Sequence, residues 1–253
     1  MAACILISAA SALGITGAII SQEVSPGQDL DREIIVGNGE NESSHNMTAE
    51  VLGYATNEGG ANIALQPEED TGPYTARPFL SIDPENFTLG PGEIKTLRLK
   101  GTVPDDVTSG GLYASVVILP EPVFDKENNI NVVTGFMSLV MLTIKGSNLI
   151  KTGEIKNLSA STQEKGVAVD VLFENNGNVE YKPLVTASLE DDQGKILSTK
   201  GPIEDRILPT CSRLFRFQIV PEAELSPGEY NITAVAKLSD GTVLDSKETT
   251  FTV

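Results

Sequence analysis

Residues 87–99 read Phe87-Thr88-Leu89-Gly90-Pro91-Gly92-Glu93-Ile94-Lys95-Thr96-Leu97-Arg98-Leu99. Apolar and polar residues alternate on both sides of the central corner, a pattern typical of half-buried strands. Proline at the second and glycine at the third position of the corner suit a type II turn, because glycine adopts a positive φ at little cost. The stretch therefore predicts two strands joined by a tight turn.

The same corner recurs at Ser25-Pro26-Gly27-Gln28 and at Ser226-Pro227-Gly228-Glu229. The 253 residues include 23 Gly and 14 Pro, which fall between short apolar runs and favour strands over helices. Outside the extreme N-terminus, no long segment places apolar residues at helical spacing. We expect an all-β protein with two immunoglobulin-like β-sandwich domains in tandem.

The segment Lys145-Gly146-Ser147-Asn148 is interpreted as the joint between the two domains, which gives domains at 14–146 and 147–253. Beyond the joint about seven strands follow in roughly 100 residues, the spacing that a sandwich requires. In the first domain we expect strands at Gly14–Ile20 and at Val132–Ile144. In the second, Asn175-Asn176-Gly177-Asn178 predicts a turn that tolerates left-handed backbone.

Residues 1–13 are interpreted as an atypical signal peptide. The stretch from Ala2 to Ala12 is small or apolar and uncharged, and Ala10-Ser11-Ala12 has the small-x-small form that signal peptidase accepts. No Lys or Arg precedes the stretch, so the true start codon lies upstream or the segment is no signal. A buried first strand is the alternative. We expect a secreted or cell-surface protein that is peripheral to a membrane at most.

The chain is strongly acidic, with 18 Lys+Arg against 35 Asp+Glu and a formal net charge of -17. Such a field repels a phosphate backbone, so we expect no nucleic-acid partner. Solubility is one interpretation of the acidity, and bound divalent cations are the other. No cluster follows a calcium-loop spacing, and we expect no cofactor. The candidate ligands are Asp29, Asp31 and Glu33; Glu68, Glu69 and Asp70; and Glu190, Asp191 and Asp192.

The residue inventory argues against an enzyme. Cys4 lies in the expected signal peptide, which leaves Cys211 without a disulfide partner, and the single histidine is His45 in a polar loop. A nucleophile needs a base beside it, and a zinc site needs several His or Cys ligands. We interpret Cys211 as a small, partly buried residue at a strand end. Carboxylate pairs are abundant, but on so acidic a surface they indicate a solvated face.

Sugar binding by a β-sandwich usually employs exposed aromatic platforms, and this sequence has no Trp and 5 Tyr. Tyr113 and Tyr230 are interpreted as core residues, which leaves Tyr54, Tyr74 and Tyr181. Tyr54 and Tyr74 are the candidates for an exposed pair, with packing in turns as the alternative.

Five sequons for N-glycosylation agree with export. Each asparagine precedes Ser or Thr by two residues with no intervening proline, and each lies beside an expected turn. The candidate glycosylation sites are Asn41, Asn46, Asn86, Asn157 and Asn231.

Two series of motifs resemble a known fold family, the PapD-like immunoglobulin fold of pilus chaperones and of many surface proteins. The first is Leu80-Ser81-Ile82-Asp83-Pro84, the run 87–93, Val103-Pro104 and Gly110-Gly111-Leu112-Tyr113-Ala114. The second, Phe173–Asn178 with Leu225–Tyr230, resembles adhesion-type modules of cell-surface proteins. Such a resemblance indicates the fold more specifically than the function. Pilus chaperones hold a subunit's terminal carboxylate with two basic residues, and Arg32 and Lys145 are the nearest candidates.

Our main functional expectation is a non-enzymatic binding or scaffolding protein of the envelope, which contacts other cell-envelope proteins or surface polymers through strand edges and loops. One alternative is a periplasmic-type chaperone for pilus or surface subunits, which would need an open edge on the strand at Val132–Ile144. The other is an accessory module of a surface hydrolase.

Overall fold

Strands make up nearly all the regular structure in the computed structural model, which describes residues 13–107, 109–122 and 134–253. Within these ranges the one helical element is the single 3-10 turn η1 (Arg77–Phe79). The described residues contain no helix long and apolar enough to cross a membrane. The prediction of an all-β, two-sandwich protein is confirmed. The expected signal peptide, apart from Leu13, lies outside the described residues.

The chain divides into two compact units. The first contains residues up to Gly146, and the second contains Ser147–Val253 together with the short segments Ala55–Ile63 and Ser109–Gly111. In the first unit the strands form a four-stranded sheet, β1-β3-β8-β6, and a six-stranded sheet, β2-β10-β9-β4-β5, in which β7 also pairs with β4. Their bounds are β1 (Gly14–Thr16), β2 (Ile19–Val24), β3 (Asp29–Gly37), β4 (His45–Thr56), β5 (Asn62–Leu65), β6 (Leu80–Asp83), β7 (Asn86–Leu89), β8 (Ile94–Thr102), β9 (Gly111–Pro120) and β10 (Phe136–Ile144).

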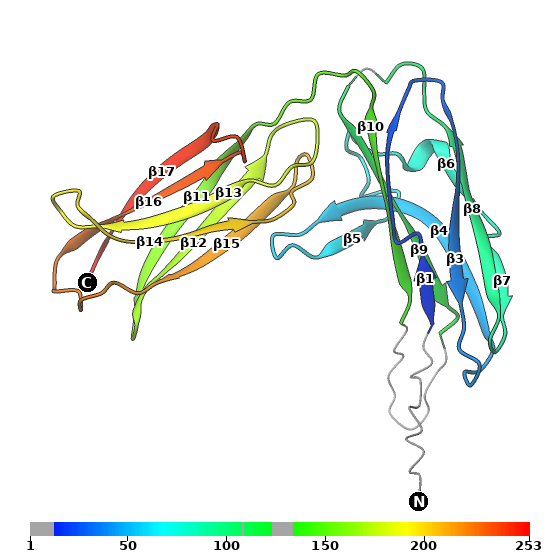
Figure 1. Ribbon diagram of the computed structural model, residues 1–253, viewed down its shortest axis with the longest axis horizontal. Coiled ribbons are helices and arrows are strands. Elements are labelled where there is room, and N and C mark those ends of the chain that lie inside the picture. The colour runs from blue at the N-terminus through cyan, green and yellow to red at the C-terminus, as the bar shows by residue number, and fades with distance from the viewer. Residues whose placement is uncertain (1–12, 108, 123–133) are drawn as a thin grey trace, which may run out of the picture. The chain divides into compact units, whose positions relative to one another are not determined.

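The second unit is also a sandwich of two antiparallel sheets. One has the order β11-β12-β15 and the other β14-β13-β16-β17, and β16 and β17 lie side by side in Figure 1. Their bounds are β11 (Gly153–Gln163), β12 (Gly166–Asn175), β13 (Leu184–Glu190), β14 (Ile196–Glu204), β15 (Ser212–Ile219), β16 (Glu229–Lys237) and β17 (Val243–Thr252).

Each unit has its own apolar core, as the alternating sequence pattern requires. In the first, inward-facing residues such as Leu97, Leu99 and Val116 are completely or almost completely buried. In the second, β12 buries every other residue from Val167 to Phe173 against strands of the facing sheet. Each sandwich therefore has a hydrophobic core of its own.

The first expected strand, Gly14–Ile20, divides between the two sheets. β1 pairs antiparallel with β3, whereas β2 pairs parallel with β10. The chain changes sheet at Gly17, which has φ 85°, a conformation that favours glycine. The apolar pattern does not reveal this division, because both pieces bury residues in the same core.

Two of the three proline–glycine corners have the expected backbone. Gly27 and Gly92 have positive φ, and the amides of Gln28 and Glu93 donate to the carbonyl oxygens of Ser25 and Gly90, both at 3.1 Å. The third corner differs. Gly228 does not have a positive φ, because its amide and carbonyl pair with Val253 at the end of β17. A contact distant in sequence has replaced the local turn.

The Asn175–Asn178 turn also differs from expectation, since none of its residues has a positive φ. Instead, the side-chain oxygen of Asn175 accepts the amide of Gly177 at 2.8 Å. Its side-chain nitrogen donates to the carbonyl oxygens of Val179 and Ile207, at 3.0 and 2.9 Å. A fully buried side chain thus holds the turn by satisfying three backbone groups.

Candidate functional site

Strand β2 forms one outer edge of the six-stranded sheet. The amides of Leu139 and Lys145 donate to the carbonyl oxygens of Ala18 and Val24, both at 2.8 Å, so even-numbered β2 residues direct their backbone groups at β10. Since direction alternates along a strand, the backbone groups of Ile19, Ser21 and Glu23 face away from β10. These three side chains are exposed, and Ile19 is 58% exposed. Among residues 13–107, 109–122 and 134–253, no strand pairs with this side of β2.

The strand expected at Val132–Ile144 starts later and is largely covered. β10 begins at Phe136, residues 132 and 133 lie outside the described part, and β2 pairs with β10 from Leu139 to Ile144. The expectation of an open edge on this strand is thus wrong over the paired length. The outer edge belongs to β2, of which the expected first strand, Gly14–Ile20, covered only Ile19 and Ile20.

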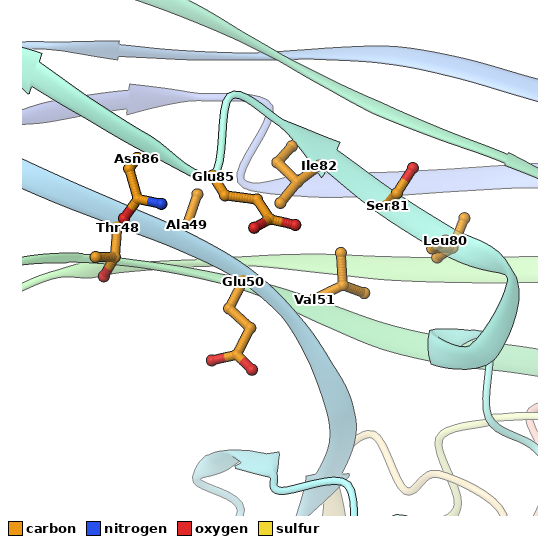
Figure 2. Close-up of a pocket in the computed structure, with 9 residues that line it drawn as sticks. All are labelled: Thr48, Ala49, Glu50, Val51, Leu80, Ser81, Ile82, Glu85 and Asn86. Atoms are coloured by element: carbon orange, nitrogen blue, oxygen red, sulfur yellow. The ribbon is translucent and has the colours of Figure 1, made fainter.

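A groove lies between β4 and β6, where the two sheets of the first unit diverge (Figure 2). It has a volume of about 380 Å³. Residues 48–51 of β4 form one side and residues 80–82 of β6 the other, and Glu85 and Asn86 close one end. The amide of Ala49 donates to the carbonyl oxygen of Glu85 at 2.7 Å, just past the last β4–β7 pair, Thr48 with Asn86.

The groove combines apolar walls with two carboxylates. Leu80 and Ile82 are buried and Val51 is half-buried, whereas Glu50 and Glu85 are exposed. In Figure 2 the Glu85 carboxylate extends over the gap between the strands, and Glu50 points to the solvent side of β4. Among the described residues neither carboxylate has an ion-pair or hydrogen-bond partner. Sequence reasoning missed this groove, because β4 and β6 are about thirty residues apart.

The acidic clusters proposed as cation ligands are engaged in other interactions. Arg98 bridges Asp31 and Glu33 at 2.9 and 3.0 Å, and Thr102 Oγ1 donates to Asp29 at 2.7 Å. The other two clusters hold loops: Asp70 accepts Arg77 Nε at 2.9 Å, and Asp191 accepts the amides of Gln193 and Lys195. Within residues 13–107, 109–122 and 134–253, no three His, Cys, Asp or Glu side chains form a group suited to a metal ion.

Cys211 and His45 are not brought together. Cys211 is a partly buried free thiol just before β15, and His45 is the half-buried first residue of β4 in the other unit. In the described part of the chain, neither residue forms a nucleophile–base pair.

The expected aromatic pair does not form a sugar platform. Tyr54 is buried and Tyr74 is half-buried, with its carbonyl oxygen accepting the amide of Tyr113 at 2.8 Å. Tyr181 is buried as well, and its hydroxyl donates to the carbonyl oxygen of Thr152 at 2.6 Å. Burial raises the pKa of Tyr181. Tyr54 and Tyr181 are therefore core residues, and Tyr74 is not part of an exposed pair.

The two basic residues suggested by the chaperone resemblance do not form a pair. The Arg32 guanidinium donates to the side chain of Gln22 and to the carbonyl oxygen of Asp31. Lys145 is exposed and follows the buried Ile144, so it points to the opposite face of the six-stranded sheet. Neither position is assigned a carboxylate-binding role.

The five sequon asparagines differ in accessibility. Asn41, Asn86 and Asn157 are exposed, and Asn86 also lines the groove. Asn46 is exposed but bonded on both sides, donating to Glu121 and accepting from Thr88 Oγ1, each at 3.1 Å. Asn231 is partly buried on β16, between β13 and β17.

One exposed pair has shifted ionisation. The hydrogen bond and charge of Lys156, whose Nζ lies 2.7 Å from Glu154 Oε1, lower the pKa of Glu154. The same hydrogen bond from Glu154 raises the pKa of Lys156. Both side chains are solvated, so the pair contributes little to a binding site.

The described residues thus define a protein of two immunoglobulin-like β-sandwiches. No protein-family model matches the sequence, and no curated protein matches it. Several solved structures match it. A chain of the chaperone–tip adhesin complex of CFA/I fimbriae biogenesis is 15% identical, with 95% of this chain and 97% of that chain covered and a TM-score of 0.46.

Two further structures are similar. The E. coli chaperone DraB is 11% identical, with 96% of both chains covered and a TM-score of 0.43. A chain from the complex of the Salmonella enterica SafA pilin with the SafB chaperone has the same identity, coverage and TM-score. At such identities the likeness concerns the fold, and it agrees with the PapD-like resemblance seen in the sequence.

The comparison corrects our main functional expectation. The similar structures are fimbrial chaperones or their complexes, which correspond to the stated alternative and not to a general envelope scaffold.

Proposed function

We propose that this protein is a chaperone-type binder of exported surface subunits, and that it holds a subunit by adding one of the subunit's strands to the outer edge of β2. The observation that supports this proposal best is the row of outward backbone groups at Ile19, Ser21 and Glu23. In strand addition, main-chain hydrogen bonds provide affinity and alternate side chains provide specificity.

The character of the β2 edge supports binding over simple exposure. Soluble proteins usually protect edge strands with charges, proline or a covering segment. Here the edge carries one charge, Glu23, at its far end, whereas Ile19 is 58% exposed at its start. Phe136 and Met137, the first two residues of β10 and not part of its pairing with β2, are half-buried. An apolar strand would cover the exposed part of Ile19.

The location and partners follow from this role. We propose that the protein acts in the cell envelope, outside the cytoplasm, and that its partners are subunits of surface structures. The similar solved structures include complexes of chaperones with a pilin or a tip adhesin. The proposal concerns binding and involves no chemical step.

A proline substitution on the free edge tests the proposal. Ser21→Pro removes an amide that faces away from β10, so the β2–β10 ladder is retained while an added strand loses a hydrogen bond. The ligand is a fluorescein-labelled 15-residue peptide of alternating valine and threonine, followed by anisotropy. We expect Ser21→Pro to weaken binding by about fivefold or more, since one net hydrogen bond contributes about 1 kcal/mol.

Two controls make the result specific. Ser21→Ala keeps the amide and should bind like the wild type, and circular dichroism must show that the proline variant is folded. A peptide N-methylated at alternate amides should bind weakly to every variant. Equal affinity of the wild type and a folded Ser21→Pro variant would show that strand addition at β2 does not occur.

A further inference from the structure

The groove between β4 and β6 lies away from the β2 edge. In the six-stranded sheet, β10 and β9 separate β2 from β4. Its volume of about 380 Å³ falls toward the lower end of the roughly 300–1,000 Å³ found for ligand sites. Two strands bound it along its sides and Glu85 and Asn86 close one end, so its shape suits an extended chain better than a compact molecule.

One wall of the groove offers backbone groups. The amide of Ala49 points to this side, toward Glu85, while the carbonyl oxygen of Asn46 accepts the amide of Glu121 on the opposite side. Because direction alternates along β4, the amide and carbonyl of Val51 also point toward the groove. The regular pairing of β4 with β9 from Met47 to Leu52 maintains this alternation. A segment lying in the groove therefore finds main-chain partners at Val51.

The opposite wall belongs to the edge of the other sheet. β6 is the last strand of the four-stranded sheet and pairs on one side with β8, from Leu80 with Gly101 to Asp83 with Arg98. Its buried residues Leu80 and Ile82 face Val51 across the opening (Figure 2). These three side chains form an apolar floor for one or two side chains of a bound segment.

The charges select the ligand. The Glu85 carboxylate extends over the opening and Glu50 lies on the other side of β4 (Figure 2), both without ion-pair or hydrogen-bond partners in the described chain. The protein carries a net charge of -17. An acidic segment would be repelled, whereas a lysine or arginine side chain would gain an ion pair at the rim. We propose that the groove binds an extended segment of a partner protein in which a basic residue is flanked by apolar residues. The proposal is independent of strand addition at β2.

The test uses the whole protein and a defined peptide, acetyl-Val-Thr-Val-Lys-Val-Thr-Val-amide with a fluorophore, compared with analogues that replace lysine by norleucine or glutamate. We expect the lysine peptide to bind about two- to fivefold more tightly than the norleucine peptide, the factor that corresponds to an exposed ion pair. The glutamate peptide should bind most weakly. High salt should remove the preference for lysine.

The variant Glu50→Gln with Glu85→Gln should lose the preference for lysine while remaining folded, because both residues are exposed. A matched variant, Glu42→Gln with Asp106→Asn, removes two exposed carboxylates elsewhere in the same unit and should keep the preference. The Ser21→Pro variant should keep it too, which separates this proposal from the proposed function.

The position of the peptide is read by photo-crosslinking, with a benzophenone group replacing one valine and mass spectrometry of the products. Crosslinks to β4 or β6 support the proposal. Crosslinks to β2 alone, or equal affinity for the lysine and norleucine peptides, would overturn it. A dimer that dissociates in the double glutamine variant would assign the groove to a second copy of this chain and would contradict it as well.

Discussion

The amide nitrogen of Ala49 lies 2.7 Å from the carbonyl oxygen of Glu85, at the point where the chain passes from one sheet to the other. On one side of this bond β7 continues along β4, and on the other β6 pairs with β8 in the opposite sheet. The segment that contains β7 and β6 therefore separates from β4 at Ala49. The space that opens between β4 and β6 beyond this point is the groove. The crossing from β6 to β7 therefore creates the groove.

Gly53 and Asp70 should be coupled in stability. A Cβ atom at position 53 would lie 2.5 Å from Cγ of Asp70, whose carboxylate is held by Thr75 and Arg77. We expect Gly53→Ala to lower the free energy of unfolding by about 1–3 kcal/mol, as overpacking does. The same change in an Asp70→Gly background should cost less, because that variant also removes the Asp70 Cβ atom, which lies 2.7 Å from the added atom. Urea unfolding of the double-mutant cycle measures the coupling, and additive effects would refute it.

Gly72→Ala is the matched control for that cycle, because a Cβ atom there meets nothing within 4 Å. Its free energy of unfolding should remain within about 0.5 kcal/mol of the wild type.

Asn175 should be among the most sensitive polar residues of the second unit. Its side chain is fully buried and bonds the amide of Gly177 and the carbonyl oxygens of Val179 and Ile207. Asn175→Ala leaves the amide of Gly177 and the carbonyl oxygen of Val179 without a partner, each costing about 1–3 kcal/mol, whereas the carbonyl oxygen of Ile207 still accepts the amide of Tyr181. We expect a loss of at least about 2 kcal/mol by chemical unfolding. The neighbouring Asn176 is exposed, and an equal loss in Asn176→Ala would contradict this account.

Tyr181 should make stability depend on alkaline pH. Its pKa is raised by burial, so above the ordinary value of about 10 the unfolded chain loses this proton while the folded chain keeps it. The unfolded state then binds fewer protons, and the free energy of unfolding falls as pH rises above about 10.

Tyr181→Phe removes that contribution together with the hydrogen bond to Thr152. Near neutral pH the variant should be about 0.5–1.5 kcal/mol less stable. The difference from the wild type should shrink between pH 9 and pH 11, as measured by urea unfolding. A constant difference over that range would exclude a titrating role for Tyr181.

Gly17 should be needed for the change of sheet between β1 and β2. Its φ is 85°, and a Cβ atom there would lie 3.0 Å from the carbonyl oxygen of Glu33. We expect Gly17→Ala to cost roughly 1–2 kcal/mol, the penalty for a left-handed non-glycine residue. Hydrogen exchange at Leu139, whose amide donates to Ala18, should accelerate. Gly14→Ala, which has open space and no positive φ, should leave both properties unchanged.

Local pattern was sufficient for the fold class. Alternating apolar residues around Gly27 and Gly92 predicted strands and turns, because both depend on neighbouring residues and on the φ that glycine allows. The residue inventory likewise indicated a protein without a catalytic histidine or cysteine site. The placement of single side chains was less predictable. For Tyr54 the sequence left exposure and packing in a turn open, and only the structure shows that it is buried in strand β4.

What the tertiary structure decided depends on contacts between distant residues. The division of the first strand at Gly17, the pairing of Gly228 with Val253 and the bond of Arg98 to Asp31 and Glu33 join segments whose proximity no local pattern encodes. The same holds for the β2 edge and for the groove between β4 and β6. Propensity acts over a few residues, whereas an edge or a groove exists only after the sheets have formed, since it is defined by which strand has no neighbour.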